Sequence, residues 1–187
     1  MSRAERIRCA WAEATPEYRD YHDQEWGVVL RADDALFERM SLEAFQSGLS
    51  WLTILRKRAA FRAAFSNFVI ANVAAFDDSD VTRLMADAGI VRNRAKITAT
   101  IGNARAALDL PSGLSDLLWS FLPTVQPPRP LTLAEVPATR PESIAMAGAL
   151  KARGFTFVGP TTSYALMQAT GMVDDHVATC WRAGAPS

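Results

Sequence analysis

Two clusters of metal-ligating side chains lie near opposite ends of this 187-residue sequence. Cys9 and His22 form the first cluster and His176 and Cys180 the second, and together they are all the cysteines and histidines of the chain. The i, i+4 spacing of His176 and Cys180 places both on one face of a helical turn. Two cysteines and two histidines complete a closed tetrahedral zinc shell. The pattern predicts one structural zinc ion per chain, with four separate core residues as the alternative.

A second group combines one carboxylate with several aromatic rings. Glu43 follows Leu36 and Met40 at i, i+4, i+7 spacing in a helix expected over 33–46, so its carboxylate shares their buried face. The nearby rings are Trp11, Tyr18, Tyr21, Trp26 and Trp51. Such rings stack a planar, electron-poor ligand while a carboxylate accepts its hydrogen bonds. The alternative is an aromatic core in which Glu43 is paired with an arginine.

The charge changes sign abruptly between two expected helices. Acidic side chains dominate residues 77–87, and Arg92, Arg94 and Lys96 follow with no acid among them. A turn between two helices directs free backbone N–H groups at a phosphate, and the dipole of the second helix adds attraction. The pattern predicts a DNA-backbone contact, with a solvated basic face as the alternative.

Helical periodicity runs through nearly the whole chain, with no sustained alternation typical of strands, and this predicts an all-α fold. After 33–46, further helices are expected from a Ser50 cap, from 78–80, and through Ile97, Ile101, Ala104 and Leu108. A capping box at Thr139 and Glu142 opens a helix that ends near Arg153, and a last helix restarts at Pro160 and ends near Gly171.

Six of the ten prolines lie in 123–141, which marks a long connection. The expected unit is a single domain over 1–187. Its two expected lobes are about 33–122, with the helical hairpin, and 1–32 plus 139–187, with the zinc site.

Composition limits the class of protein. With 49% hydrophobic and 21% charged residues the chain is globular, and its zero net charge argues against non-specific coating of nucleic acid. No apolar run approaches the ~20 residues of a membrane span. The charged N-terminus lacks the apolar core of a signal peptide, so we expect no membrane association, a cytoplasmic location and reduced cysteines.

Short segments along almost the whole chain resemble one known family. They are 8–11, 21–23, 25–28, 42–43, 48–51, 87–90, 101–106, 154–155, 157–159 and 175–177. In these residues the chain resembles DNA-3-methyladenine glycosylase I, a family of the helix-hairpin-helix superfamily of base-excision enzymes. The resemblance implies a monofunctional glycosylase that flips 3-methyladenine out of double-stranded, alkylated DNA and hydrolyses its N-glycosidic bond. Free 3-methyladenine is the expected product, and a monomer is expected.

The resemblance also implies roles for individual residues. Glu43 would recognise the flipped base, Tyr21 and Trp51 would stack it, and Gly48 with Leu49 would press into the DNA stack. The remaining rings, Tyr18, Trp11 and Trp26, would complete the pocket. The zinc ligands would be Cys9, His22, His176 and Cys180.

Three positions bear on the DNA contact and on catalysis. Ala95 stands where the family's glycine is expected, and it would weaken the DNA contact if that position needs positive φ. Asp116 is the nearest candidate for the aspartate of related superfamily members, although the resembled family is thought to work without one. For Lys96, a phosphate contact is favoured over a Schiff base.

Two other classes of function are alternatives. The first is a non-catalytic DNA-binding helix-hairpin-helix module with a structural zinc, which would bind DNA without releasing base. The second is a zinc hydrolase or nucleobase deaminase. This class is disfavoured because the H-x-E and P-C-x-x-C pattern is absent and four protein ligands leave zinc no open position.

Overall fold

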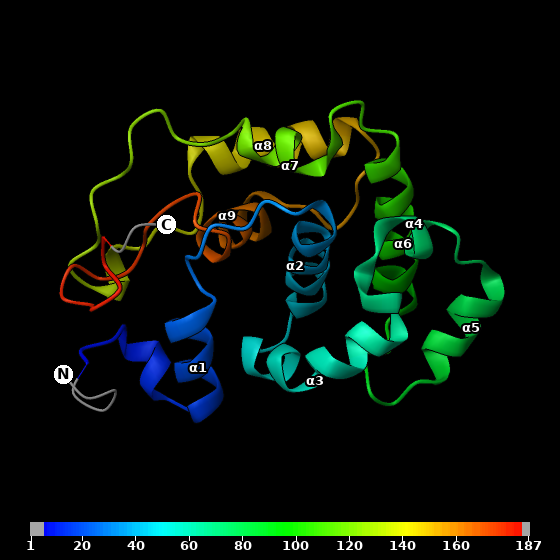
Figure 1. Cartoon of the computed structure of the whole chain (residues 1–187), viewed down its shortest axis with the longest axis horizontal. Coiled ribbons are helices and arrows are strands. Elements are labelled where there is room, and N and C mark those ends of the chain that lie inside the picture. Colours follow the sequence, from blue (N-terminus) through cyan, green and yellow to red (C-terminus); the bar gives the residue numbers. More distant parts are fainter. Residues whose placement is uncertain (1–5, 185–187) are drawn as a thin grey trace.

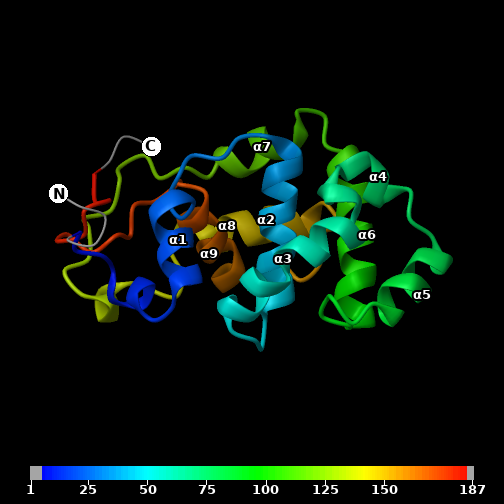
Figure 2. The same cartoon turned by 60° about the horizontal axis from the view of Figure 1, so that its bottom comes forward.

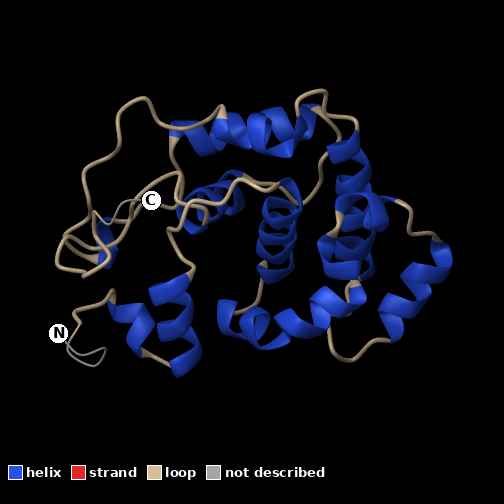
Figure 3. Ribbon diagram, in the orientation of Figure 1, coloured by secondary structure: helices blue, strands red, loops and turns tan. Residues whose placement is uncertain are grey.

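The structure, a computed structural model, describes residues 6–184, and these form helices and loops with no strand (Figures 1 and 3). The prediction of an all-α fold is confirmed for them. Residues 1–5 and 185–187, at the two ends of the expected domain, lie outside the described part. The division into two lobes stays a prediction.

The central helices begin and end where local capping signals predict. Helix α2 (Asp33–Gln46) has the expected bounds, and Gly48 follows its cap at φ 84°. Helix α3 (Trp51–Ala64) begins after Ser50, whose hydroxyl accepts a hydrogen bond from the N–H of Thr53 at 3.2 Å. Helices α5 (Asp78–Ala86) and α6 (Arg94–Leu108) enclose the expected hairpin turn.

Some elements depart from the sequence expectation. Helix α1 (Pro16–Gln24) is additional, and its sequence signal is the Thr15 cap followed by proline. The other additional elements are short: η2 (Ala10–Glu13), η3 (Ser66–Phe68), α4 (Ile70–Ala74), α7 (Gly113–Trp119) and η4 (Leu133–Glu135).

The expected capping box at Thr139 is wrong by one residue. Helix α8 (Pro141–Ala152) begins after Arg140, whose N–H donates to the Ser143 hydroxyl at 3.0 Å. That hydroxyl donates in turn to the Arg140 carbonyl at 2.9 Å, so a serine takes the place expected for Glu142. Helix α9 (Pro160–Ala169) begins where predicted, and Gly171 follows it at φ 76°.

One continuous apolar core joins α2 to the helices around it. Phe37, Phe45, Phe61, Ile97 and Met146, from four different helices, are among its buried members. Leu108 does not share the burial of Ile97, Ile101 and Ala104, with which its spacing places it on one helix face. At the end of α6 the chain buries Ala107 instead, and Leu108 is exposed.

The two ends of the described chain lie together at one end of the molecule, away from the α5–α6 hairpin at the other (Figures 1 and 2). A backbone hydrogen bond from the N–H of Trp181 to the carbonyl of Ile7, 2.9 Å long, joins them. A second, small core beside this junction contains Cys9, Val177 and Cys180. Among residues 6–184, no helix has the length and apolar character required to cross a bilayer.

Candidate active site and metal centre

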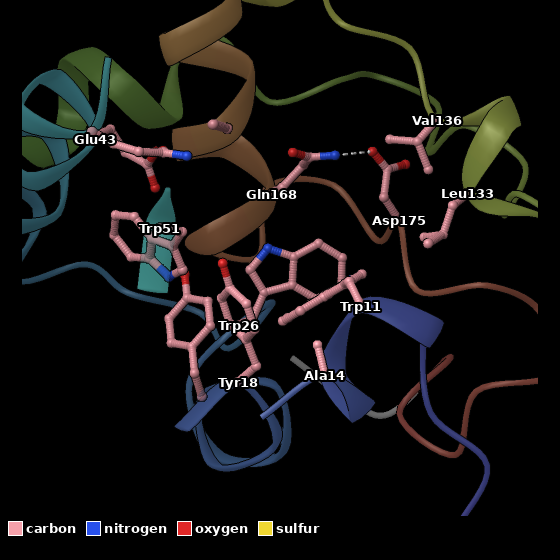
Figure 4. A pocket seen from close by; sticks show the side chains of 13 residues that line it. Trp11, Ala14, Tyr18, Trp26, Glu43, Trp51, Leu133, Val136, Gln168 and Asp175 are labelled. Atoms are coloured by element: carbon pink, nitrogen blue, oxygen red, sulfur yellow. Dashed lines mark hydrogen bonds between the residues drawn. The ribbon is translucent and has the colours of Figure 1, made fainter. Parts of the chain in front are cut away.

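A cavity of about 550 Å³ lies between the N-terminal helices, α2, α3 and α9. It is lined by all six residues that the sequence grouped together: Trp11, Tyr18, Tyr21, Trp26, Glu43 and Trp51. Figure 4 shows Glu43 at one end of the cavity, and Gln168 with Asp175 toward the other. The fold therefore joins the aromatic residues and the carboxylate in one concave site.

The rings form a connected wall. Trp11 lies edge-on to Tyr18 and to Trp26, with ring centroids 5.8 Å and 5.2 Å apart. Tyr21 and Trp51 are 5.5 Å apart, which connects α1 to α3. The hydroxyl of Tyr18 accepts a hydrogen bond from the backbone N–H of Leu52 at 3.0 Å. This contact satisfies an N–H in the first turn of α3 and holds the two helices together.

Glu43 is the unusual group of this cavity. Its residue is 5% exposed, and no described residue gives it a hydrogen bond or an ion pair, so the expected alternative of a paired arginine is not found within 6–184. Burial raises the pKa of its carboxyl to about 7, against the opposing field of Arg39. A buried carboxylate without a partner is unfavourable for folding, and such groups occur mainly at functional sites.

Sequence reasoning missed the opposite wall of the cavity. Gln168 of α9 donates a hydrogen bond from Nε2 to Asp175 at 2.7 Å (Figure 4). The same carboxylate oxygen of Asp175 accepts from the Tyr164 hydroxyl at 2.5 Å. The sequence signals for Asp175 are its position beside His176 and its place in the segment 175–177 of the family resemblance, whereas a lone glutamine in a largely apolar helix indicates no particular role.

Three of the four expected metal ligands converge. The ligand atoms of Cys9, His22 and Cys180 all lie within 4.8 Å of one another, and all three residues are buried. Nε2 of His22 is 3.3 Å from Sγ of Cys180. His176 is adjacent, with its ring 5.1 Å from that of His22, and its Nε2 is buried without a hydrogen-bond partner among the described residues. This orphaned nitrogen and the two sulfurs fit a thiophilic cation such as zinc.

Neighbouring groups orient these ligands. Nδ1 of His22 lies 3.0 Å from Asp23, and Nδ1 of His176 lies 2.9 Å from Asp174, an arrangement that leaves each Nε2 for a metal. Although burial opposes it, the hydrogen bonds from Arg8 and His22 hold the pKa of Asp23 well below its usual range.

The two cysteines affect each other's titration. The neighbouring Cys9 lowers the pKa of Cys180, with burial opposing this shift and His22 adding to it. A lowered pKa favours the thiolate of Cys180, the form that binds metals. The backbone N–H groups of Val177 and Arg182 donate to Cys9 and Cys180, each at 3.4 Å.

The expected helical turn from His176 to Cys180 is not observed. After Gly171 the chain continues in turns, and the Asp174 side chain accepts a hydrogen bond from the N–H of His176 at 3.3 Å. This local bond competes with helical pairing, as aspartate side chains often do. The two ligands therefore reach the centre from an irregular segment.

The hairpin turn between α5 and α6 is held by side chains from both sides. Asp87 accepts the N–H of Gly89 at 2.7 Å, and Asn93 caps α6. Arg92 and Arg94 are exposed and form no ion pair within 6–184. Ala95 lies in the first turn of α6 with an ordinary negative φ, so this position does not require glycine for backbone reasons.

Lys96 is not the free cation that the sequence predicts. Its residue is 7% exposed, and Nζ donates to the carbonyls of Phe45 at 2.9 Å and Ser47 at 2.7 Å. The last carbonyls of a helix lack hydrogen-bond partners within the helix, and Lys96 donates to two such carbonyls at the end of α2. Burial lowers the pKa of Lys96, and its ammonium holds the start of the Gly48–Leu49 loop instead of facing a phosphate.

Gly48 and Leu49 lie in the loop between α2 and α3, and Asp116 is the remaining candidate of the sequence analysis. Leu49 is 42% exposed, and Gly48 has open space where a side chain would begin. Asp116 is exposed on α7 and does not line the aromatic cavity.

Comparison with known proteins gives one consistent family. A family model described as methyladenine glycosylase matches residues 11–183. DNA-3-methyladenine glycosylase 1 of Escherichia coli (strain K12) is 48% identical over 177 residues, which cover 92% of this chain and 95% of that protein. DNA-3-methyladenine glycosylase of Haemophilus influenzae is 41% identical over 181 residues, covering 92% and 96% of the two chains.

Solved structures agree in fold. A crystal structure of a 3-methyladenine DNA glycosylase I, 44% identical, superposes with a TM-score of 0.89 and covers 94% of this chain and 98% of that one. The 3-methyladenine DNA glycosylase I of Staphylococcus aureus, solved to explain its recognition of 3-methyladenine, is 32% identical. It superposes with a TM-score of 0.90 and covers 96% and 98% of the two chains.

Proposed function

Because the chain belongs to the methyladenine glycosylase family, we propose that the cavity around Glu43 receives the base that the enzyme removes. The protein is a DNA-3-methyladenine glycosylase, a hydrolase of the N-glycosidic bond. The observation that carries the site proposal is the buried Glu43 carboxylate, which has no protein partner within 6–184 and opens onto a wall of aromatic rings.

The chemistry of the substrate explains these residue types. A purine methylated at N3 carries a positive charge in DNA, so electron-rich rings attract it more strongly than they attract adenine. The carboxylate of Glu43 adds to this preference. When the glycosidic bond breaks, its electron pair moves to the base, which leaves as a neutral molecule. Water then adds to C1′ of the sugar and loses a proton, and an activated leaving group of this kind requires little acid catalysis.

A base reaches this cavity only outside the DNA stack. Tyr21 and Trp51 are the rings proposed to stack the flipped base, and Tyr18, Trp11 and Trp26 complete the pocket. The exposed Leu49 beside Gly48 is proposed to fill the gap left in the duplex. Lys96 supports this loop from inside and is not proposed to touch DNA.

One zinc ion is proposed to join Cys9, His22, His176 and Cys180. Four protein ligands leave the ion no open position, so when bound it supplies folding energy and no Lewis-acid chemistry. The proposal is supported by the convergence of three ligands and the unpartnered Nε2 of His176.

The proposed helix-hairpin-helix contact with DNA yields a prediction for Arg94. Arg94→Ala makes the negative slope of the logarithm of the DNA association constant against the logarithm of the salt concentration less steep by about 0.9 for each phosphate that the protein no longer neutralises, with little change in specificity. Fluorescence anisotropy of a labelled duplex over a series of salt concentrations measures the slope. Arg31→Ala, which removes an exposed arginine stacked on Trp119, is the matched control. Equal slopes for wild type and Arg94→Ala would exclude the contact.

Base release from methylated double-stranded DNA tests the activity directly. We expect free 3-methyladenine in the soluble fraction, detected by chromatography, and no release from untreated DNA. Binding of methylated DNA without release would instead support the non-catalytic binding module, which the family and its relatives disfavour. The cytoplasmic location and the monomeric state stay predictions.

A further inference from the structure

Arg39 contacts the aromatic wall from behind the cavity. It lies on α2 one turn before Glu43, and its side chain is 11% exposed. Nη1 donates a hydrogen bond to the hydroxyl of Tyr21 at 2.7 Å. The guanidinium carbon lies 5.2 Å from the ring centroid of Tyr21 and 5.9 Å from that of Trp51. Arg39 thus touches both rings proposed to stack the base without lining their cavity; it faces a separate cavity of about 260 Å³.

The charge of Arg39 is only partly neutralised. Its nearest carboxylate is that of Glu25, 3.4 Å from Nη2. Glu25 is already bound by both terminal nitrogens of Arg58, at 2.5 Å and 2.7 Å. Two guanidinium groups therefore share one carboxylate, and the cluster keeps an excess of one positive charge close behind the aromatic wall.

That excess charge faces Glu43. Three charged or titratable groups surround Glu43. Arg39 lies on the same helix and the Tyr21 phenol comes from α1. Asp175 lies across the cavity, and its carboxylate accepts hydrogen bonds from Tyr164 and Gln168. The pair formed by Glu25 and Arg58 completes the charged groups on this side. Burial favours the protonated acid, and Arg39 is the cation whose field opposes that effect.

We propose that Arg39 is a positioning residue that keeps Glu43 ionised and fixes the Tyr21 ring from behind the pocket, with no contact to the base. The inference rests on the proposed role of Glu43. With Glu43 ionised, its negative charge balances the excess on the arginine cluster, and the cavity accepts a cationic base. With Glu43 protonated, the uncompensated cluster repels that base.

The test is the pH profile of kcat/KM for release of 3-methyladenine from methylated duplex DNA. Arg39→Gln removes the charge and keeps an N–H donor, Arg39→Met removes both, and Arg39→Lys keeps the charge. Loss of the charge raises the pKa of Glu43, so the acid limb moves to higher pH by about one unit in the Gln and Met variants. It stays near the wild-type position in Arg39→Lys. At about pH 6 the kcat/KM of the Gln and Met variants is about tenfold below that of the wild type, and this difference shrinks toward about pH 9.

Arg62→Met is the control, because Arg62 pairs with Glu38, contacts neither stacking ring and does not line the aromatic cavity. We expect no shift of its acid limb. An unshifted limb in both neutral Arg39 variants, or an equal loss at every pH, overturns the inference. Inactive wild-type enzyme, or a wild-type acid limb that survives in Glu43→Gln, would instead refute the proposed function of the site and not the role of Arg39 alone.

Discussion

Glu43→Gln lowers kcat/KM for release of 3-methyladenine by about 10²–10³-fold, the range seen when one preorganised electrostatic group is removed from an active site. The amide occupies the same volume and leaves the cavity in place, but it carries no charge to attract a cationic base. Base release from methylated DNA under single-turnover conditions measures the loss. The matched control is Glu142→Gln, a change in the first turn of α8 that leaves the cavity untouched.

Although Glu43→Gln lowers activity, it is expected to raise the stability of the folded protein above the pKa of Glu43. The pKa of Glu43 is about 7 in the folded protein and about 4.3 in the unfolded chain, so the folded state binds more protons between these values. Wild-type stability therefore falls as pH rises from about 4 to about 7. Glu43→Gln removes that loss and is more stable at about pH 8 by roughly 2–3 kcal/mol. Chemical denaturation of both proteins below and above the folded-state pKa checks the sign of this stability difference.

For the activity prediction, unchanged excision of 3-methyladenine by a folded Glu43→Gln variant would refute the role of the carboxylate.

Cys180→Ala has the second large effect, because a proposed metal ligand and a buried thiolate are removed together. We expect less than one zinc per chain and a decrease in the free energy of unfolding of about 3–5 kcal/mol, since metal-binding energy contributes directly to folding. The midpoint of thermal unfolding falls by roughly 10 °C. Metal analysis and thermal unfolding measure the two quantities. Thr179→Ala, at the exposed neighbouring position, serves as the control.

Activity falls in Cys180→Ala as a consequence of the structural change. Trp26 lies 4.5 Å from the ring of His176, and Trp11 lies 5.3 Å from that of His22, so the proposed ligands pack directly behind two pocket rings. At a temperature where the variant remains folded, part of the activity should therefore return. A metal-free wild-type protein with an unchanged unfolding midpoint would exclude the structural zinc.

Local signals account for what the sequence predicted about the pocket. The bounds of α2 follow from its periodicity and the glycine after its end, and the same periodicity directs Glu43 toward the core. Cysteine and histidine are so few in this chain that their chemistry indicated a shared site before any geometry was available. The direction of a side chain that leaves its helix carries no such signal, and for this reason the sequence does not reveal that Lys96 binds the carbonyls of Phe45 and Ser47.

Local patterns along the chain thus predict the helical class, the ends of the central helices, the candidate metal ligands and the types of residue around the substrate cavity. Which oxygen or ring each buried cation contacts follows instead from the packing of the helices. Lys96 reaches carbonyls about fifty positions earlier in the chain, and Arg39 reaches Tyr21 eighteen positions earlier. Buried cations bind whichever oxygen or ring the packing brings near, because leaving them unpaired is unfavourable. That choice depends on how the helices pack against each other, and no spacing along the chain encodes it.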